Sequence, residues 1–143
     1  MSAIPFRPLP QNAPQTCILE VCDTGNTLDL YGDRLSSQGY EVVSANNYAD
    51  GLKLAHECHP ALVVVYDDPT TKIDALRWLE LQHTDRDASL AMTPLLILAD
   101  STRAGYLRYE ELPDRVVVVQ RRADTLNQLT RAVKHLLRVW NME

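Results

Sequence analysis

The chain has 143 residues, 45% of them hydrophobic and 23% charged, a composition that fits one folded globular domain and excludes a disordered or collagen-like chain. Its longest apolar runs, residues 61–66 and 116–119, are far shorter than the roughly 18 residues that a membrane span needs, so we expect no membrane contact. The net charge of −5 gives no electrostatic reason to expect nucleic-acid binding. The first eight residues lack the pattern of a secretory signal, and we therefore expect a cytoplasmic protein.

Five short apolar runs follow a proline-rich start. Residues 1–15 hold four prolines and few core formers, which predicts a flexible tail before a single domain over residues 16–143. The third run is almost continuous in β-branched side chains, as expected for a central strand buried on both faces. The runs predict strands, in chain order, at residues 17–22, 40–45, 62–66, 94–99 and 116–119.

An amphipathic stretch follows each of these runs. After the first run, apolar residues recur with helical spacing at Leu28, Tyr31 and Leu35, and Gly39 supplies a stop. Asn46 or Asn47 can cap the second helix, which Pro60 ends. The other three helices are predicted from apolar stripes that contain, in turn, Ile73, Leu76 and Leu79; Ala104, Leu107 and Leu112, bounded by Pro113; and Leu126, Leu129, Val133, Leu136 and Trp140.

Strands that alternate with helices in this way predict an α/β domain, in which a five-stranded parallel sheet carries helices on both faces. In such folds the functional loops lie beyond the carboxyl ends of the strands, where helix N-termini converge. The candidate functional residues are therefore those that follow the strands, namely Asp23, residues 66–68, residues 99–101 and residues 120–122.

Several segments resemble the receiver domain of bacterial two-component response regulators, over nearly the whole folded chain. Residues 18–23 look like the family's apolar first strand with acids at its end, and residues 39–45 match its G-Y-x-V-x-x-A second strand. Residues 60–65 resemble the lead into the phosphorylated aspartate, residues 94–98 the fourth strand, and residues 129–137 the L-x-x-x-V-x-x-L-L pattern of the last helix. The resemblance implies a CheY-like (βα)5 flavodoxin-like fold with strand order 2-1-3-4-5 and a role in two-component signalling or a phosphorelay.

The residues that take part in the phosphorylation of a receiver are mostly replaced in this chain. A receiver accepts a phosphoryl group on an aspartate, with Mg²⁺ held by carboxylates, a Thr or Ser that bonds the phosphate, and a Lys that pairs with it. By this resemblance, Asp23 keeps one of the two acids after the first strand, and Cys22 takes the place of the other. Tyr66 stands at the acceptor position, Ala99 at the Thr/Ser position and Arg122 at the Lys position.

A shifted alignment preserves the phosphorylation chemistry. With one extra residue in the third strand, Asp67 becomes the acceptor, with Asp68 as its neighbouring alternative, and Asp74 stands where the family's loop aspartate would be. Asp23 and Asp67 would then hold Mg²⁺, and Arg122 would offset the charge of the phosphate. This alignment requires a bulge in the strand and still lacks the hydroxyl group.

The same residues have simpler structural interpretations. Asp67 and Asp68 fit a solvated acidic turn that caps the next helix, and Asp23 fits an N-cap. Tyr66 fits a half-buried core aromatic with a solvated hydroxyl. Cys22, at the rim of the expected pocket, is interpreted as packing, because no basic residue beside it in the sequence would lower the pKa of its thiol.

The cysteines and the charge pattern add two expectations. Three cysteines without CxxC spacing predict buried thiols, and no further ligand in the sequence joins His56, Cys58 and His59 to make a zinc site. Residues 121–143 carry a net charge of +3, whereas residues 1–120 carry −8. A basic last helix on an acidic body predicts docking to an acidic partner.

We predict a stand-alone degenerate receiver, or pseudo-receiver, that acts in signal transduction as a phosphorylation-independent protein–protein interaction module. It would need no cofactor and catalyse no reaction. Because the chain ends at Glu143, soon after the last predicted helix, we expect output through a protein partner, either a signalling protein such as a histidine kinase or a second copy of the chain.

The alternative is a functional phospho-receiver that takes a phosphoryl group from a histidine kinase on Asp67 with Mg²⁺. A flavodoxin-like nucleotide binder is disfavoured, because the turn after the first strand holds a single glycine, Gly25. In receivers the surface of the fourth helix, fifth strand and fifth helix commonly contacts partners. The resemblance therefore implies a partner-binding set made of Tyr106, Tyr109, Glu110, Arg131, Lys134, Arg138 and Trp140.

Overall fold

The computed structural model describes residues 16–23, 25–68, 73–121 and 125–141, with the side chains of residues 25–29 and 141 excepted. The predicted tail, residues 1–15, and Arg122 at the predicted Lys position lie outside the described residues.

Five parallel strands form one sheet in the order β2-β1-β3-β4-β5, which confirms the predicted fold class and strand order. The central strands β1, β3 and β4 are buried along their whole length, as expected for apolar strands with helices on both faces. The edge strands β2 and β5 are partly exposed. Their bounds are β1 (Cys17–Val21), β2 (Glu41–Ala45), β3 (Leu62–Tyr66), β4 (Leu95–Ala99) and β5 (Val116–Gln120).

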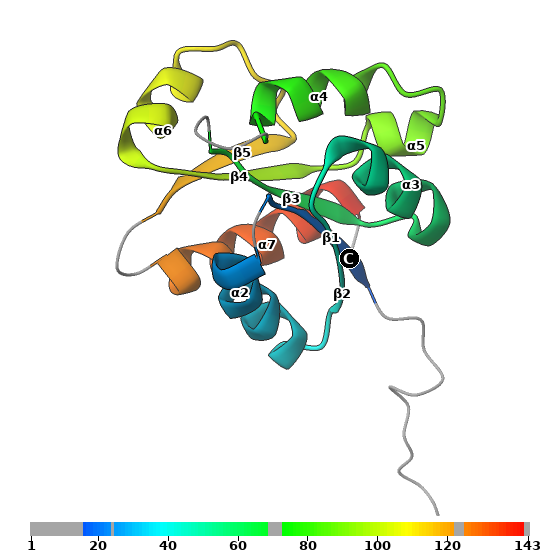
Figure 1. Cartoon of the computed structure of the whole chain (residues 1–143), viewed down its shortest axis with the longest axis horizontal. Coiled ribbons are helices and arrows are strands. Elements are labelled where there is room, and N and C mark those ends of the chain that lie inside the picture. Colours follow the sequence, from blue (N-terminus) through cyan, green and yellow to red (C-terminus); the bar gives the residue numbers. More distant parts are fainter. Residues whose placement is uncertain (1–15, 24, 69–72, 122–124, 142–143) are drawn as a thin grey trace, which may run out of the picture.

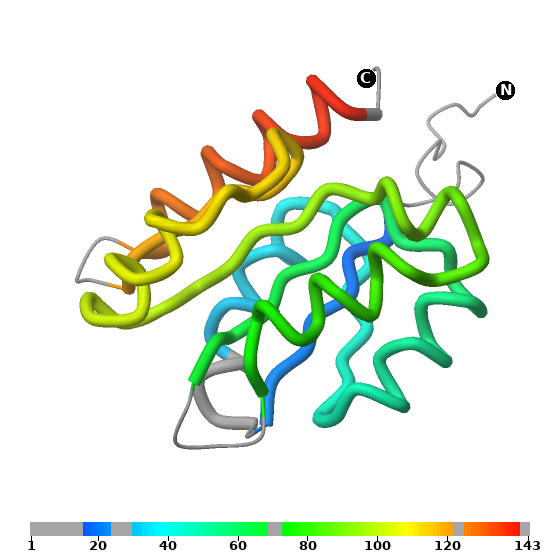
Figure 2. The backbone as a smooth tube through the Cα atoms, turned by 90° about the horizontal axis from the view of Figure 1, so that it is seen from above, coloured from blue at the N-terminus to red at the C-terminus, as the bar shows by residue number. Residues whose placement is uncertain are grey.

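The helices cover the two faces of the sheet unequally (Figure 1). One face carries α2 (Gly25–Ser37) and α7 (Thr125–Asn141), and the other carries α3 (Tyr48–Cys58), α4 (Ala75–His83), α5 (Ala88–Ala91) and α6 (Ser101–Arg108). Because strand side chains alternate between faces, each strand contributes to both hydrophobic cores. Figure 2 shows α3 at one side of the molecule and α6 with α7 at the other, where β5 forms the sheet edge.

Several helix ends confirm the predicted turn chemistry. Gly39 has a φ of 97°, a left-handed conformation that suits glycine and ends the segment after α2. Asn47 is the N-cap of α3, because its side-chain oxygen accepts a hydrogen bond from the backbone N–H of Asp50 at 2.8 Å. In the part of the chain that the structure describes, no helix has both the length and the hydropathy that crossing a bilayer requires.

Two predicted helix boundaries were wrong, and one short helix was not predicted. Ile73 precedes α4, because it pairs with Asp68 in an isolated β-bridge and Asp74 caps the helix. A short helix, α5, begins at Ala88, within residues 83–89, where the sequence is polar and predicts no helix, and Asp87 caps it. Leu112 lies beyond the end of α6 at Arg108.

Candidate functional site

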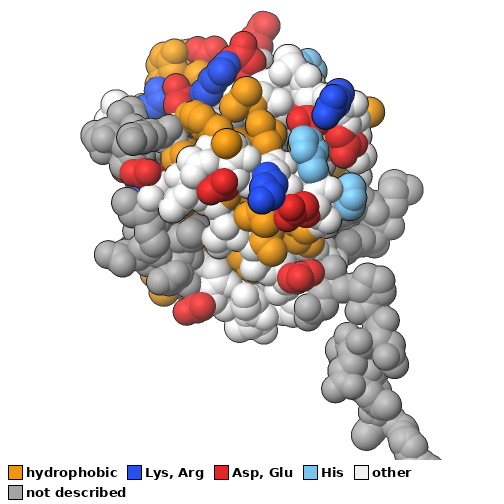
Figure 3. Space-filling model, turned by 45° about the vertical axis from the view of Figure 1, so that its right-hand side comes forward, with side chains coloured by type: hydrophobic (Ala, Val, Ile, Leu, Met, Phe, Trp, Pro, Cys, Tyr) orange, Lys and Arg blue, Asp and Glu red, His pale blue; other side chains and the backbone are white. Residues whose placement is uncertain are grey.

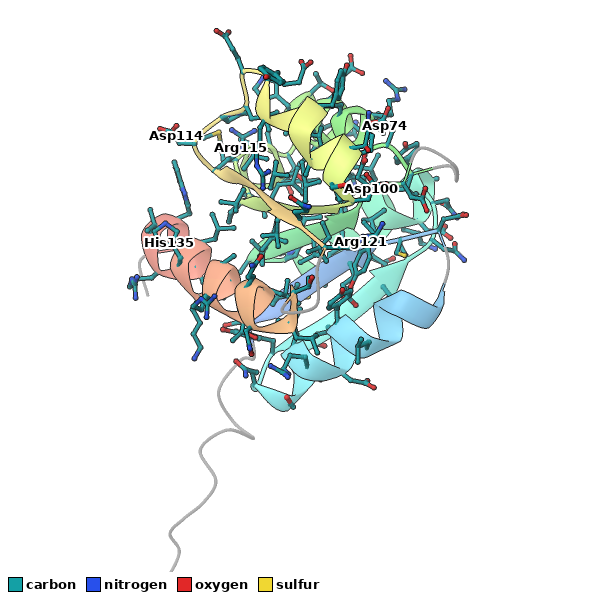
Figure 4. The ribbon with its side chains drawn as sticks, turned by 90° about the vertical axis from the view of Figure 1, so that its left-hand side faces the viewer. Asp74, Asp100, Asp114, Arg115, Arg121 and His135 are labelled. Atoms are coloured by element: carbon teal, nitrogen blue, oxygen red, sulfur yellow. The ribbon has the colours of Figure 1, made fainter. Side chains whose placement is uncertain are left out.

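The predicted site residues lie at one end of the sheet, where the strands reach their carboxyl ends. Cys22 and Asp23 follow β1, residues 66–68 end or follow β3, and Ala99 ends β4. Figure 4 shows Asp74, Asp100 and Arg121 at this end of the molecule, from the starts of α4 and α6 and the end of β5.

Asp67 is fully buried, so its interpretation as part of a solvated turn was wrong. Its backbone N–H donates to the carbonyl oxygen of Leu98 at 2.8 Å and extends the sheet by one residue. Its Oδ2 accepts a hydrogen bond from Nε of Arg103 at 2.7 Å, and its Oδ1 accepts from Nη2 of Arg103 at 3.0 Å and from the backbone N–H of Ala75 at 2.7 Å. Both carboxylate oxygens are therefore occupied by a bidentate pair and a helix N-terminus.

Arg103 reaches Asp67 from the first turn of α6. A cation is unfavourable near a helix N-terminus, where the backbone dipole is positive, so it requires nearby anions. Asp67 is the main anion. Asp74 is a second one, because its Oδ1 accepts the third hydrogen bond of the guanidinium, which Nη2 donates at 3.3 Å. The hydrogen bonds that Arg103 donates to the Asp67 carboxylate raise the pKa of Arg103 further above its usual range. The guanidinium carbon also lies 5.1 Å from the centre of the Tyr106 ring.

Tyr66 points to the opposite face of the sheet from Asp67. Its side chain is 3% exposed, so the prediction of a half-buried ring with a solvated hydroxyl was wrong. The ring lies 5.5 Å from that of Tyr31, and the hydroxyl donates to the buried Glu20 carboxylate at 3.3 Å. Burial, together with the negative charge of Glu20, raises the pKa of Tyr66. The residue that the resemblance places at the acceptor position is therefore a neutral phenol within the core.

The remaining site residues do not assemble into a carboxylate cluster. Ala99 is buried and carries no hydroxyl, Asp23 and Asp68 are partly exposed, and Cys22 is buried in the core beside α2 and α7. Among the described residues, no group of three or more His, Cys, Asp or Glu side chains is arranged to hold a metal ion. Mg²⁺ is held by oxygen ligands, and the Asp67 carboxylate is fully buried and accepts three hydrogen bonds, so the ion would have to displace Arg103 to bind this side chain.

Two of the residues considered for a zinc site, His56 and Cys58 of α3, contact other side chains of the protein. Nε2 of His56 lies 3.0 Å from both carboxylate oxygens of Asp85. Cys58 is partly exposed and contacts the buried Cys17. Burial, and to a smaller extent this contact, raises the pKa of Cys17 to about 12.

On the face shown in Figure 3, acidic, basic and histidine side chains lie among hydrophobic ones, so this face carries mixed charge.

The predicted partner-binding set is accessible and borders the same element that carries Arg103. Tyr106 is 50% exposed, Tyr109 91% and Trp140 39%, which leaves three large aromatic side chains in contact with solvent. The polar members of the set, Glu110, Arg131, Lys134 and Arg138, are also exposed. Tyr106 lies on α6, Tyr109 and Glu110 directly follow this helix, and the other members lie on α7; the role of the set in binding stays a prediction.

The comparisons with known proteins identify the fold. No protein-family model matches the chain, and no curated protein matches it in sequence. The structure is similar to the chemotaxis response regulator CheY4 of Vibrio cholerae, with a TM-score of 0.71 and 15% identity over 87% of this chain and 100% of that one. A receiver domain protein of Methanospirillum hungatei JF-1 gives 0.69 and 18% identity, over 90% of this chain and 98% of that one.

A third similar structure is the receiver domain of the hybrid histidine kinase CckA. Its TM-score is 0.63, at 22% identity over 85% of this chain and 98% of that one. The chain thus has the fold of CheY-like response regulator receiver domains.

Proposed function

We propose that the chain is a degenerate receiver that acts in cytoplasmic signal transduction as a phosphorylation-independent protein-binding module. Output would pass through the surface formed by α6, β5 and α7 to a signalling protein or to a second copy of the chain. In this proposal the chain catalyses no reaction and needs no cofactor.

The state of Asp67 is the observation that carries the proposal. Phosphorylation requires a carboxylate oxygen that can attack phosphorus and a metal ion that offsets the charge of the phosphoryl group. Here both oxygens of Asp67 accept hydrogen bonds from Arg103 or Ala75, and the guanidinium already supplies a positive charge. An incoming phosphoryl group would have to break a bidentate ion pair that is fully buried on its acidic side.

The neighbouring positions support the same proposal. Tyr66 stands where the family's acceptor is expected, but its hydroxyl is bonded to Glu20 inside the core. Ala99 stands at the Thr/Ser position and cannot donate a hydrogen bond to a phosphate.

Incubation with acetyl phosphate and Mg²⁺, followed by intact-mass analysis, tests the proposal. We expect no phosphoryl adduct on the wild-type chain, nor on the Asp67→Asn and Asp68→Asn variants. The alternative function, a working phospho-receiver that uses Asp67 or Asp68 with Mg²⁺, requires an adduct on the wild type that one of these variants loses. Such a result would overturn the proposal and identify the acceptor.

The proposed output surface requires a separate test. Aromatic side chains are frequent anchors of protein interfaces, and the basic residues of α7 would steer an acidic partner towards Tyr106 and Tyr109. A protein captured by the immobilised chain should be lost with Tyr109→Ser, retained with Lys53→Ser on α3, and unaffected by acetyl phosphate. Equal capture by both variants would place the partner on another surface.

A further inference from the structure

Two thiols meet at the amino end of β1, and the proposed function uses neither of them. Cys17 is the first residue of β1 and is 7% exposed, whereas Cys58 is the last residue of α3 and is partly exposed. The two side chains lie within hydrogen-bonding range of each other, and this contact contributes to the raised pKa of Cys17. A thiol that solvent reaches therefore lies beside one that the core shields.

The packing of α3 on the sheet brings the two cysteines together. This helix packs against β1 and β2 on one face of the sheet (Figure 1). Because strand side chains alternate between faces, Cys17 points to the same face as Leu19 and Val21, which lie in the core that α3 covers. Cys58 thus belongs to the helix that lies over Cys17.

The backbone after α3 keeps the pair close. His59 ends the helix with a left-handed φ of 49°, and its N–H donates to the carbonyl oxygen of Ala55 at 3.0 Å. The N–H of Ala61, three residues after Cys58, then donates to the carbonyl oxygen of Cys17 at 2.8 Å. The folded chain therefore limits how far the two cysteines can separate.

The third cysteine lies on the other side of the sheet. Cys22 is buried in the core that faces α2 and α7, whereas Cys17 points to the core under α3. The sheet therefore keeps Cys22 away from the pair. This separation makes Cys22 a matched internal control.

We propose that Cys17 and Cys58 form a reversible disulfide within the native fold when the chain meets a small-molecule disulfide such as oxidised glutathione. Such a reaction needs one thiol that the oxidant can reach and a second thiol close enough to displace the first product. Cys58 meets the first condition through its exposure, and Cys17 meets the second through its contact with Cys58.

The reaction has two exchange steps. In the first, the deprotonated Sγ of Cys58 attacks one sulfur of oxidised glutathione, and the other sulfur leaves as a thiolate. In the second, Cys17 loses its proton, its Sγ attacks Sγ of Cys58, and the second glutathione leaves. The two protein thiols are oxidised, one small disulfide is reduced to two thiols, and the two released protons end on those thiols.

Intact-mass analysis of the whole reduced chain after incubation with oxidised glutathione tests the proposal. The free thiols are alkylated before unfolding is complete, and a peptide map assigns the linkage. We expect the chain to lose the mass of two hydrogen atoms, with Cys17 linked to Cys58, and dithiothreitol to restore the reduced mass. No oxidation, a lasting glutathione adduct, or a dimer linked through Cys58 would overturn the proposal.

Cysteine variants identify the two partners. Cys22→Ala should form the same disulfide as the wild type, because it removes the thiol on the opposite face. Cys17→Ser should stop at the glutathione adduct on Cys58, and Cys58→Ser should form no disulfide. Disulfide formation in Cys58→Ser would assign the bond to Cys17 and Cys22 and contradict the proposal. If Cys17→Ser does not fold, the peptide map of the wild type still decides.

Thermal unfolding shows whether the bond fits the fold. A bond between Cys17 and Cys58 closes a loop of the unfolded chain and lowers its entropy, so the oxidised chain should melt at least about 5 °C above the reduced one. Cys58→Ser should show no such rise after the same treatment. If the midpoint of the oxidised wild type does not rise, the bond forms only by distorting the native structure, and the proposal is wrong.

Discussion

The contact between Asp67 and Arg103 changes what the carboxyl end of β3 can do. A carboxylate at a strand end is a good nucleophile or metal ligand when its lone pairs point to solvent. Asp67 is fully buried, and the three N–H groups of Arg103 and Ala75 occupy its oxygens at 2.7–3.0 Å. In this chain Asp67 therefore anchors two helices, α4 through Ala75 and α6 through Arg103.

Removal of Arg103 should leave the Asp67 charge buried without its partner. We expect Arg103→Met to lower the free energy of unfolding by about 2–4 kcal/mol, a little less than for fully buried pairs because the Arg103 side chain is 18% exposed. Urea denaturation at pH 7 measures the loss, and Arg108→Met, an exposed site on the same helix, should change it by less than about 0.5 kcal/mol.

The double variant Asp67→Asn/Arg103→Met completes this test. It should recover part of the stability that Arg103→Met loses, because the isolated charge is gone. If the double variant is less stable than the single one, Asp67 is stabilised chiefly by the Ala75 N–H, and the ion pair contributes little.

Asp85 predicts a dependence of stability on pH. The N–H of Asp87, with a smaller contribution from His56, lowers the pKa of Asp85 in the folded chain. A carboxyl whose folded pKa lies below its unfolded value of about 3.9 stabilises the fold above that pH, and the contribution is lost as the pH falls through the folded pKa. Asp85→Asn should therefore be less stable than the wild type at pH 7, with a gap that shrinks below about pH 4 in urea titrations. A gap that stays constant to pH 3 would exclude this cause.

Single residues were the hardest part of the site to predict from the sequence. The sequence places Asp67 one position after Tyr66, and strand alternation indicates opposite faces, but the pattern does not say which residue finds a partner. The signal that could have identified Arg103 is a cation in the first turn of a helix, where it conflicts with the helix dipole. That conflict predicts a nearby anion, and two aspartates, Asp67 and Asp68, follow β3, which lies next to β4 in the sheet.

At the scale of elements, α6 connects the buried pair to the exposed surface. Asp100 caps the helix by accepting a hydrogen bond from the backbone N–H of Arg103 at 2.8 Å. One turn later, Tyr106 contacts the guanidinium with one side of its ring and remains half exposed. The position of the predicted output surface therefore depends on the contacts that hold Arg103.

Substitution by alanine should have opposite effects on stability at two helical glycines. A Cβ at Gly51 in α3 would lie 2.9 Å from the Trp78 ring, whereas at Gly105 in α6 it would meet nothing within 4 Å. Gly51→Ala should lower the free energy of unfolding by about 1–3 kcal/mol through overpacking. Gly105→Ala should raise it by about 0.5–1 kcal/mol, because alanine has the higher helix propensity. Thermal and urea denaturation of both variants measure the difference. Stabilisation by Gly51→Ala would mean that Trp78 moves away easily.

Element boundaries depend on contacts that the local sequence does not contain. The helix α5 has four residues, too few for an apolar stripe, and Gln82 of α4 holds its end by donating to the carbonyl oxygens of Leu90 and Thr93 at 3.0 and 2.7 Å. Long periodic stripes, such as that of α7, contain enough information to predict a helix. Short helices that are fixed by a distant amide do not.

At the scale of the whole molecule, one sheet separates two hydrophobic cores. Leu62, Val64 and Tyr66 of β3 face α2 and α7, whereas Val63 and Val65 face α3, α4 and α6. Since every central strand is shared, neither core can be lost without the other. We therefore expect a single cooperative unfolding transition.

The two tryptophans allow a direct test of this cooperativity. Trp78 is fully buried in one core, and Trp140 is 39% exposed on α7. In Trp140→Phe, the fluorescence of the remaining Trp78 and the far-UV circular dichroism of the whole chain should give the same urea midpoint. Separate midpoints would show that the core around Trp78 unfolds on its own.

The fold was predictable from the sequence because its signals are redundant. Five apolar runs, each followed by an amphipathic stretch, allow few arrangements besides a parallel sheet with helices on both faces. The site depends instead on a few side chains whose partners lie 8 to 36 positions away in the sequence. One substitution in such a set changes its chemistry and leaves the fold intact.

The contact between Asp67 and Arg103 joins two parts of the same chain, and this has a consequence for timing. A phosphorylated side chain persists only until hydrolysis and must be renewed by a donor. A contact that forms as the chain folds needs no donor and has no such lifetime. The number of molecules in the proposed binding state then equals the number of folded molecules, so synthesis and degradation of the chain would set the strength of its signal.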